Sequence, residues 1–188
     1  MALEVESISA DADVLMNLLA TNCAVEILRD LRMVLLVSPA VSDESIYLES
    51  ADASGDRAPI DLRELEQAGV LQKTNLSDEK LEFVIELARQ VDDGEAEAIS
   101  VGMSRRVRVA TDDRKARRAA SDRGNALLST PDMLHDWQAA ANISDAKMSS
   151  VLRLIGRRSR FRPPADHGLY AWWMQLLILD EARGGESR

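Results

Sequence analysis

A run of five residues without a polar side chain, MVLLV at residues 33–37, constrains the fold more than any other feature of the sequence. The run is short, and Ser38-Pro39 follows it at once and ends the regular element. Uninterrupted apolar runs of this length are typical of strands that are covered on both faces, as in parallel sheets. The sequence therefore predicts a buried parallel strand, whose sheet needs helices on both of its faces.

Strand-like and helix-like segments alternate along the rest of the chain. Further short strands are predicted at residues 4–10, 70–74, 107–111 and 126–129. Helices are predicted at residues 11–31 (one broken or two short), 43–51, 62–69, 78–90, 93–104, 113–124, 132–141, 145–158 and 169–179. This alternation predicts an α/β fold, with three α/β/α layers around a central, mostly parallel sheet. The predicted division is a domain over residues 1–143 and a C-terminal helical extension over residues 144–188, packed on that domain.

Three local features of the sequence lead to further expectations. Thr130 and Pro131 are predicted to begin a helix, as N-cap and first helical residue. The hydrophilic residues 51–61 are predicted to form a mobile insertion. Trp172 and Trp173 in the last helix are expected to pack on the core or on a second subunit rather than stack on bases.

Composition excludes several classes of protein. No apolar run approaches the ~18 residues that a membrane helix needs, and the N-terminus has neither the basic nor the apolar segment of an export signal. The single cysteine, Cys23, cannot form an internal disulfide. We expect a cytoplasmic protein without membrane contact.

The net charge of −9 is divided unevenly along the chain. Residues 1–104 carry a net charge of −15, whereas residues 105–188 carry +6. Residues 146–165 contain six basic residues and no acid. This division predicts an acidic feature in one part of the molecule and a basic surface in the other, although solvated helix faces explain most charge runs.

The sequence lacks phosphate-binding loops, dinucleotide fingerprints, zinc-protease motifs and cysteine pairs. What remains is a set of carboxylates at the ends of predicted strands. Asp11 and Asp113 each follow a strand directly, and ligands bind at the carboxyl ends of parallel strands. Aspartate at such a position is also a common helix N-cap, which is the better reading of either residue alone. A cluster of several carboxylates would need a hard cation such as Mg²⁺ to offset its repulsion.

Four blocks of sequence, taken together, resemble PIN-domain nucleases. They are ISADADVLMNLL (residues 8–19), VSDESIYLES (41–50), DDGEAEAISVG (92–102) and VRVATDDRKAR (107–117), in the order found in that family. The pair GEAEAI and TDDRKARR is similar to a VapC-like branch of these proteins. The resemblance implies Mg²⁺- or Mn²⁺-dependent hydrolysis of RNA, with a small antitoxin partner and a homodimer as further expectations.

The resemblance also assigns site residues. It implies catalytic carboxylates at Asp11, Glu49, Glu97 and Asp113, with Glu44 as the fallback for Glu49, and metal ligands at Asp11, Glu97 and Asp113. Supporting positions are Asp13, Glu95, Thr111 and Asp112. Asp13 stands where the family usually has Asn or Ser. Glu95 is expected to point away from Glu97, because the two lie about 200° apart on a helix.

Basic residues would let a polyanion approach such a carboxylate cluster. Candidate RNA contacts are Arg114, Lys115, Arg117 and Arg118, with a second candidate patch at Arg153, Arg157, Arg158, Arg160 and Arg162. Two alternatives remain open. One is a PIN-fold protein that no longer cleaves and binds RNA or protein, and the other, less favoured, is an acidic-pocket phosphatase or receiver domain.

Overall fold

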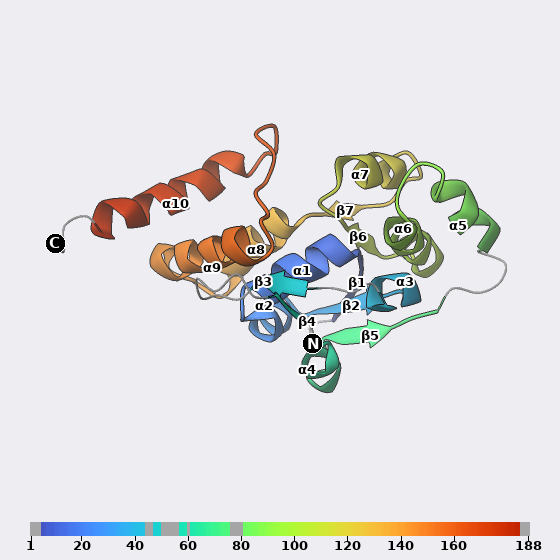
Figure 1. The fold of residues 1–188 in the computed structure, drawn as a ribbon, viewed down its shortest axis with the longest axis horizontal. Coiled ribbons are helices and arrows are strands. Elements are labelled where there is room, and N and C mark those ends of the chain that lie inside the picture. The colour runs from blue at the N-terminus through green and yellow to red at the C-terminus, as the bar shows by residue number, and fades with distance from the viewer. Residues whose placement is uncertain (1–4, 44–46, 50–56, 60, 76–80, 185–188) are drawn as a thin grey trace.

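A sheet of five parallel strands, in the order β5-β2-β1-β6-β7, forms the centre of the molecule (Figure 1). The computed structural model describes residues 5–43, 47–49, 57–59, 61–75 and 81–184. The strands are β1 (Glu6–Ala10), β2 (Met33–Val37), β5 (Leu71–Lys73), β6 (Arg108–Ala110) and β7 (Leu127–Leu128). Every pairing in this sheet is parallel. The predicted α/β/α fold class and the predicted strand at residues 33–37 are therefore confirmed.

Helices cover both faces of the sheet. One side carries α1 (Ala12–Ala20), α2 (Ala24–Asp30), α8 (Thr130–Ala140), α9 (Asp145–Arg158) and α10 (Tyr170–Gly184). The other carries α5 (Leu81–Leu87), α6 (Asp93–Arg105) and α7 (Arg114–Ser121). Two short helices, α3 (Pro39–Asp43) and α4 (Arg63–Gln67), follow β2 and precede β5. The broken helix predicted at residues 11–31 is thus two helices.

Successive residues of each central strand serve opposite cores. Ile8 packs with α1 and α2, whereas the Ser9 hydroxyl donates to the Ala98 carbonyl of α6 at 2.7 Å. Likewise, Val109 belongs to the core under α6 and α7, and Ala110 to the core under α1. This alternation follows from the period of two in a strand, and burial on both faces explains the continuous apolar run in β2.

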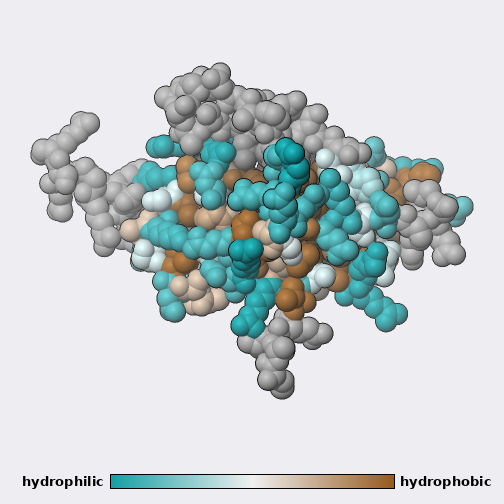
Figure 2. Space-filling model, turned by 90° about the horizontal axis from the view of Figure 1, so that it is seen from below, coloured by the Kyte–Doolittle hydropathy of each residue, from teal (hydrophilic) through white to brown (hydrophobic). Residues whose placement is uncertain are grey.

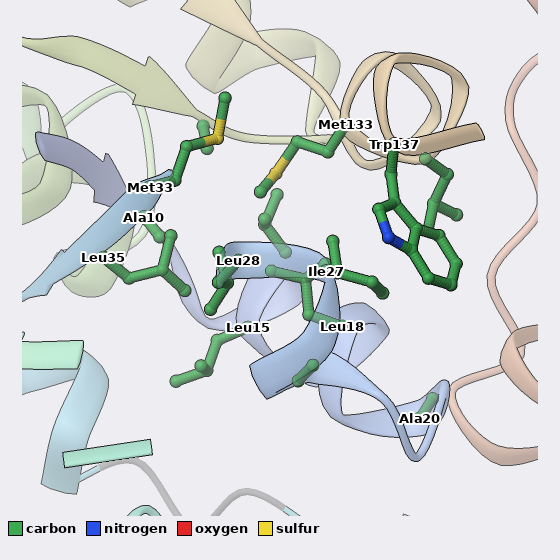
Figure 3. Packing of buried hydrophobic residues seen from close by; sticks show 14 of the residues in the cluster. Ala10, Leu15, Leu18, Ala20, Ile27, Leu28, Met33, Leu35, Met133 and Trp137 are labelled. Carbon is green, nitrogen blue, oxygen red and sulfur yellow. The ribbon is translucent and has the colours of Figure 1, made fainter. Parts of the chain in front are cut away.

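The larger core lies where α1 and α2 meet α8 (Figure 3). Leu18, Ile27 and Met133 are fully buried there beside Trp137. The indole N–H of Trp137 donates to Asp30 at 2.9 Å, so this buried donor is satisfied. The interlocking of these side chains fixes α8, and with it the loop that precedes it, relative to the sheet.

The segment after β2 departs from the prediction. Instead of a helix at residues 43–51, the chain forms α3 from Pro39 to Asp43 and then β3 (Tyr47–Glu49), which pairs antiparallel with β4 (Arg57–Pro59). Proline is favoured at the first position of a helix, which explains the earlier start. Ile46-Tyr47-Leu48 is a β-branched, aromatic and aliphatic sequence that suits a strand. Most of the predicted mobile insertion, residues 51–56 and 60, lies outside the described residues.

The start of α8 differs by one residue from the prediction. Ser129, not Thr130, is the N-cap, because its hydroxyl accepts from the Asp132 N–H while the Asp132 carboxylate accepts from the Ser129 N–H at 3.0 Å. This reciprocal pair is a capping box, in which aspartate takes the place of the usual glutamate. Pro131 still lies in the first turn, as predicted.

The C-terminal helices pack on the same core as the sheet. Met148, Val151 and Leu152 of α9 are buried in the larger core, and α10 adds Trp173 and Leu176. The expectation that the tryptophan segment packs on the protein is therefore confirmed. Figure 2 shows one face of the molecule, on which hydrophilic residues surround smaller hydrophobic patches. Among the described residues, no helix is long and apolar enough to cross a membrane.

Candidate functional site

The two strands at the centre of the sheet end in the carboxylates that the sequence singled out. Asp11 follows β1, and its backbone N–H donates to the Ala110 carbonyl at the end of β6, at 3.1 Å. Asp113 lies three residues beyond Ala110. Because β1 and β6 are parallel neighbours, both aspartates lie at the same edge of the sheet.

Backbone N–H groups at helix N-termini hold one oxygen of each carboxylate at this edge. Asp11 caps α1 through the Val14 N–H at 2.8 Å. Asp113 caps α7 through the N–H groups of residues 115 and 116, at 2.7 and 2.9 Å. Glu95 accepts from the Asp92 N–H at the start of α6, at 3.0 Å. The partial positive charge of these helix ends partly offsets the crowding of the acids.

Capping and ligand binding are compatible at these positions. The hydrogen bonds of Asp11, Glu95 and Asp113 use one oxygen of each carboxylate. A carboxylate has two oxygens and can take a cation on the second. The N-cap reading is thus correct for Asp11 and Asp113, and it leaves the second oxygen of each carboxylate for a ligand.

These acids surround a cavity of about 490 Å³, which we call the acid cleft. It is lined by Asp11, Ala12, Asp13, Ala40, Asp92, Asp93, Gly94 and Glu95. A smaller hollow shares Asp92 and Glu95 with the cleft and adds Asp113 and Lys115. Five aspartate or glutamate side chains therefore line one opening, and Asp113 adjoins it.

Asp11 is the most deeply placed of these acids, with 2% of its surface exposed. Its Oδ2 atom is buried and has no hydrogen-bond partner. Burial raises the pKa of Asp11 well above its ordinary value, and the charges of Asp112 and Asp13 raise it further. The nearby Thr111 hydroxyl, which forms no hydrogen bond of normal geometry with Asp11, and the Val14 N–H oppose that rise in pKa. A bare buried carboxylate oxygen is costly, and a bound cation would satisfy it.

Burial, and to a smaller extent repulsion between carboxylates, raises the pKa of two other members of the acid cleft. Removal from water raises the pKa of Glu95 to about 6, with smaller contributions from the charges of Asp113, Asp92 and Asp13. Partial removal from water and the charges of Asp113 and Asp92 likewise raise the pKa of Asp13. Glu95, Asp13 and Asp113 are therefore close enough to act on one another, although they come from three helices.

Glu97 lies at the margin of the acid cleft. Its carboxylate accepts from the Ala40 N–H of α3 at 3.0 Å, and Ala40 lines the cavity. Glu97 thus fastens α3 to α6, whereas Glu95 faces the other acids, as their separation on the helix requires. The geometry favours Glu95 over Glu97 as the third acid, and the assignment of Glu97 stays a prediction.

Glu49 lies on a strand rather than on the expected helix. It pairs with Arg57 in the β3–β4 hairpin, and β3 lies against α1 and α9. The side chain of Glu49 and the whole of Glu44 lie outside the described residues. Glu44 follows α3 directly in the sequence, and α3 borders the acid cleft through Ala40.

Asp112 and Thr111 do not line the acid cleft, but their hydrogen bonds hold together the elements around it. The Asp112 carboxylate accepts from the Asn17 amide at 2.9 Å and from both the N–H and the hydroxyl of Thr130. It thereby joins α1, the end of β6 and the start of α8. The Thr111 hydroxyl accepts from the Asp113 N–H at 3.3 Å. Asp112 thus points toward Asn17 and Thr130, away from the acid cleft.

The predicted RNA contacts on α7 differ in their surroundings. Arg117 donates to the carbonyls of Thr111 and Leu128, at 3.0 and 3.1 Å, and so secures the ends of β6 and β7. Arg114 is paired with Asp166, at 2.9 Å. Lys115 lines the hollow beside Asp113, and Arg118 is exposed.

In the second predicted basic patch, at residues 153–162, two of the arginines hydrogen-bond to neighbouring helices. Arg158 donates to the Leu19 and Ala20 carbonyls at the end of α1, and Arg153 donates to the Leu177 carbonyl of α10. Both arginines thus join α9 to a neighbouring helix, and the Leu19 and Ala20 carbonyls lie at the end of α1, where backbone carbonyls need donors. Arg157, Arg160 and Arg162 are exposed.

The acid cleft suits a hard divalent cation in its donor chemistry. Among residues 5–43, 47–49, 57–59, 61–75 and 81–184, no three acidic, histidine or cysteine side chains already stand together as a metal site. Mg²⁺, however, is commonly held by one or two carboxylates, with waters and substrate phosphates completing its shell. The partnerless Asp11 oxygen and the neighbouring Glu95 and Asp113 meet that need. Asp92, which is not among the predicted site residues, also lines the cleft, and its signals in the sequence are its place in the DDGEAEAISVG block and before a predicted helix.

The fold and the acid cleft together define an α/β protein with an acid-lined pocket at the carboxyl edge of a parallel sheet. A family model, DUF3368, described as a PIN domain, matches residues 7–162. The chain belongs to this PIN-domain family. PIN domains are generally nucleases, which supports a hydrolase that binds nucleic acid. Comparisons with curated proteins and with solved structures gave no match.

Proposed function

We propose that the protein is a Mg²⁺- or Mn²⁺-dependent endoribonuclease that hydrolyses phosphodiester bonds in single-stranded RNA. The observation that carries the proposal is the buried Oδ2 of Asp11, which has no partner and lies at an opening lined by acids. A structural aspartate would normally satisfy both oxygens when it is buried this deeply. A buried carboxylate oxygen that has no hydrogen-bond partner and lies among like charges is a feature of a ligand site.

In this proposal Asp11, Glu95 and Asp113 hold the cation, and Asp13 and Asp92 add to the negative potential around it. The cation, when bound, supplies a reactive water at neutral pH and offsets charge on the phosphate. The protein's own contribution is placement. The ends of β1 and β6 and the first turns of α1, α6 and α7 fix the carboxylates before the substrate arrives.

Lys115 and Arg118 are proposed to offset the repulsion between the acid cleft and the RNA backbone. Lys115 lines the hollow that contains Asp113, so its charge stands beside the site of reaction. Arg118 is exposed on the same helix. Arg117 is excluded from this role, because its guanidinium already binds two backbone carbonyls.

The VapC-like resemblance adds a biological setting to the proposal: a toxin that is neutralised by a small antitoxin, acting as a homodimer. The support is the pair of blocks GEAEAI and TDDRKARR. Co-expression with the product of the neighbouring small reading frame tests this setting. A toxin would slow cell growth alone and form a stable complex with that product.

The cleavage assay compares 5′-labelled single-stranded RNA, double-stranded RNA and single-stranded DNA, each with Mn²⁺, Mg²⁺ or EDTA. We expect cleavage of single-stranded RNA with either metal and none with EDTA. Four matched substitutions, Glu44→Gln, Glu49→Gln, Glu95→Gln and Glu97→Gln, assign the remaining acids. We expect Glu95→Gln to abolish cleavage and Glu97→Gln to reduce it less.

Absence of metal-dependent cleavage in every reaction would contradict the proposal. If the protein then still bound RNA, the catalytically silent binding module would replace the nuclease. Cleavage that continued in EDTA would contradict the role of the acid cleft, since none of its carboxylates could then act through a cation.

A further inference from the structure

A second cleft lies on the other side of the β6–α7 connection from the acid cleft. Its volume is about 430 Å³, within the range of roughly 300–1,000 Å³ that small-molecule sites occupy. One wall is the first turn of α7, the floor is the start of α8, and the opposite wall is formed by residues between 161 and 169. Residues 161–169 belong to the connection between α9 and α10, which Figure 1 shows as the orange loop that rises above α8. We call this second cleft the linker cleft.

The two clefts are joined by three consecutive residues. Asp113 borders the hollow beside the acid cleft, while its neighbours Asp112 and Arg114 line the linker cleft. Successive Cα atoms are about 3.8 Å apart, so the two clefts are separated by little more than this turn. A chain of nucleotides whose phosphate lay at Asp113 would therefore reach the linker cleft with an adjacent nucleotide.

Arg114 gives the linker cleft a phosphate-binding group. Its guanidinium Nη2 lies 3.1 and 2.9 Å from the two oxygens of Asp166, and the two side chains are 77% and 69% exposed. Exposed ion pairs contribute little to stability, so exchange of Asp166 for a phosphate costs little. Arginine matches the oxygens of a phosphate in the same forked geometry that it uses for a carboxylate.

His167 gives the cleft a ring that is held in place. The Leu169 N–H donates to Nδ1 at 3.1 Å, so Nδ1 is the acceptor nitrogen. Nε2 lies 3.1 Å from the Ser129 hydroxyl, which itself donates to the Asp132 carboxylate. Nε2 therefore carries the hydrogen and donates to Ser129.

With both nitrogens engaged, His167 offers the cleft an aromatic surface rather than an acid or a base. Phe161 lines the same cleft and packs edge-on against Trp173, with ring centroids 5.7 Å apart. Fixed aromatic rings beside an exposed arginine are the elements from which single-stranded RNA sites are built, since bases stack on the rings and arginine takes the phosphate.

We infer that the linker cleft binds the nucleotide next to the scissile phosphate of a single-stranded RNA, with Arg114 on its phosphate and His167 against its base. This inference rests on the proposed function. Asp166 competes with the RNA for Arg114 in the free protein. The linker cleft would thus contribute to substrate selection. It favours unpaired bases, because a base that is not paired in an RNA duplex is free to enter the cleft.

Binding is measured by fluorescence anisotropy of a labelled single-stranded oligoribonucleotide, in an Asp113→Asn background so that cleavage does not interfere. We expect Arg114→Gln to weaken binding several-fold and to lower the slope of log Kd against log salt by about one. Arg63→Gln at the start of α4, which removes the same charge from another exposed arginine–aspartate pair, is the matched control and should leave binding nearly unchanged. Asp166→Asn should tighten binding, because it frees Arg114.

A second pair of substitutions tests the ring. His167→Ala should weaken binding, whereas His167→Phe should restore it, because the ring remains while the hydrogen bonds are lost. Equal effects of Arg114→Gln and Arg63→Gln, or equal effects of the two His167 substitutions, would overturn the inference.

Failure of this inference differs from failure of the proposed function. Metal-dependent cleavage by the wild type, with RNA affinity unchanged in the Arg114 and His167 variants, would refute the linker cleft alone. The expected binding changes without any cleavage would refute the nuclease and leave the cleft as an RNA site. A wild-type protein that bound no RNA would overturn both.

Discussion

Replacement of Asp11 by asparagine should stabilise the metal-free protein, even though it removes a residue of the proposed active site. Asparagine retains the oxygen that accepts from the Val14 N–H, and it is as good an N-cap as aspartate. It replaces the buried charge, which the charges of Asp112 and Asp13 also disfavour, by a neutral amide, although the amide nitrogen is still a buried polar atom. A buried charge costs more than a buried neutral polar group, so the free energy of unfolding should rise by about 1 kcal/mol. For a chain of this size the melting temperature should rise by roughly 2–4 °C per kcal/mol.

The stability gained by Asp11→Asn should increase with pH. Burial raises the pKa of Asp11 in the folded state above its value in the unfolded chain. The wild type therefore loses stability as pH rises through the folded-state pKa, whereas the asparagine variant has no carboxyl group to titrate at this position. The gain from Asp11→Asn should be full at alkaline pH and should shrink as the pH falls and wild-type Asp11 takes up a proton.

In Mn²⁺ the wild type should become more stable than Asp11→Asn. A ligand at about 100 times its Kd stabilises the folded state by about 2.7 kcal/mol, and only the wild type should bind the ion and gain this stability. Differential scanning calorimetry with EDTA and with Mn²⁺, at acidic and alkaline pH, measures all of these differences. Asp11→Ala is the control, expected about 1 kcal/mol below Asp11→Asn because the cap is lost. An asparagine variant that was less stable than the wild type in EDTA at alkaline pH would refute the reasoning.

Three further substitutions test the surroundings of the site. Glu95→Gln should stabilise the metal-free protein at pH above about 6 but not below 4.5, because the folded-state pKa is raised from 4.5 to about 6. The gain should be about 1 kcal/mol or less, since the carboxylate is partly hydrated, and thermal melts across this window measure it. Asp112→Ala should lower the free energy of unfolding by about 2–4 kcal/mol in urea titrations, because the Asn17 and Thr130 groups lose their acceptor. Arg117→Lys keeps the charge but loses the geometry that reaches two carbonyls, so it should destabilise by about 1–2 kcal/mol and leave RNA affinity nearly unchanged. Equal stability of either of the last two variants and the wild type would remove the structural role assigned to that side chain.

The sheet could be predicted from the sequence because its strands have strong local patterns. Residues 33–37 are wholly apolar, and burial on both faces of a parallel sheet is the physical reason for such a run. The segment after β2 could not be predicted in the same way. There the helical spacing competed with Pro39, which starts a helix early, and with Tyr47 and Leu48, which suit a strand.

Part of the candidate site could likewise be predicted from local sequence, whereas another part depends on how distant segments pack. That Asp11 and Asp113 lie together follows from their place after neighbouring parallel strands. The separation of Glu95 from Glu97 follows from helix geometry, but which of the two faces the cleft depends on the rotation of α6 against the sheet. That rotation is set by packing of Ala96 and Ile99 and by the bond from Ser9, which no local pattern reveals.

The linker cleft was beyond prediction because it joins segments that are far apart in the chain. Arg114 and Asp166 are 52 residues apart, and Ser129 and His167 are 38 apart. The sequence predicted Arg114 as a candidate RNA contact, but no local pattern singled out His167. Only the packing of α9 and α10 on the core brings them to one opening.

The most direct test of the account is the single-turnover rate of single-stranded RNA cleavage in Mn²⁺, compared between the wild type and Asp113→Asn. Asparagine is also a good N-cap, so the start of α7 and the fold should be preserved. We predict metal-dependent cleavage by the wild type and a rate about 100-fold lower in the variant, at the upper end of the roughly 10–100-fold loss that substitutions around a metal site typically cause. Equal rates for the two proteins, or no cleavage by a folded wild type in Mn²⁺, would contradict the claim that the acid cleft is a metal-dependent ribonuclease site.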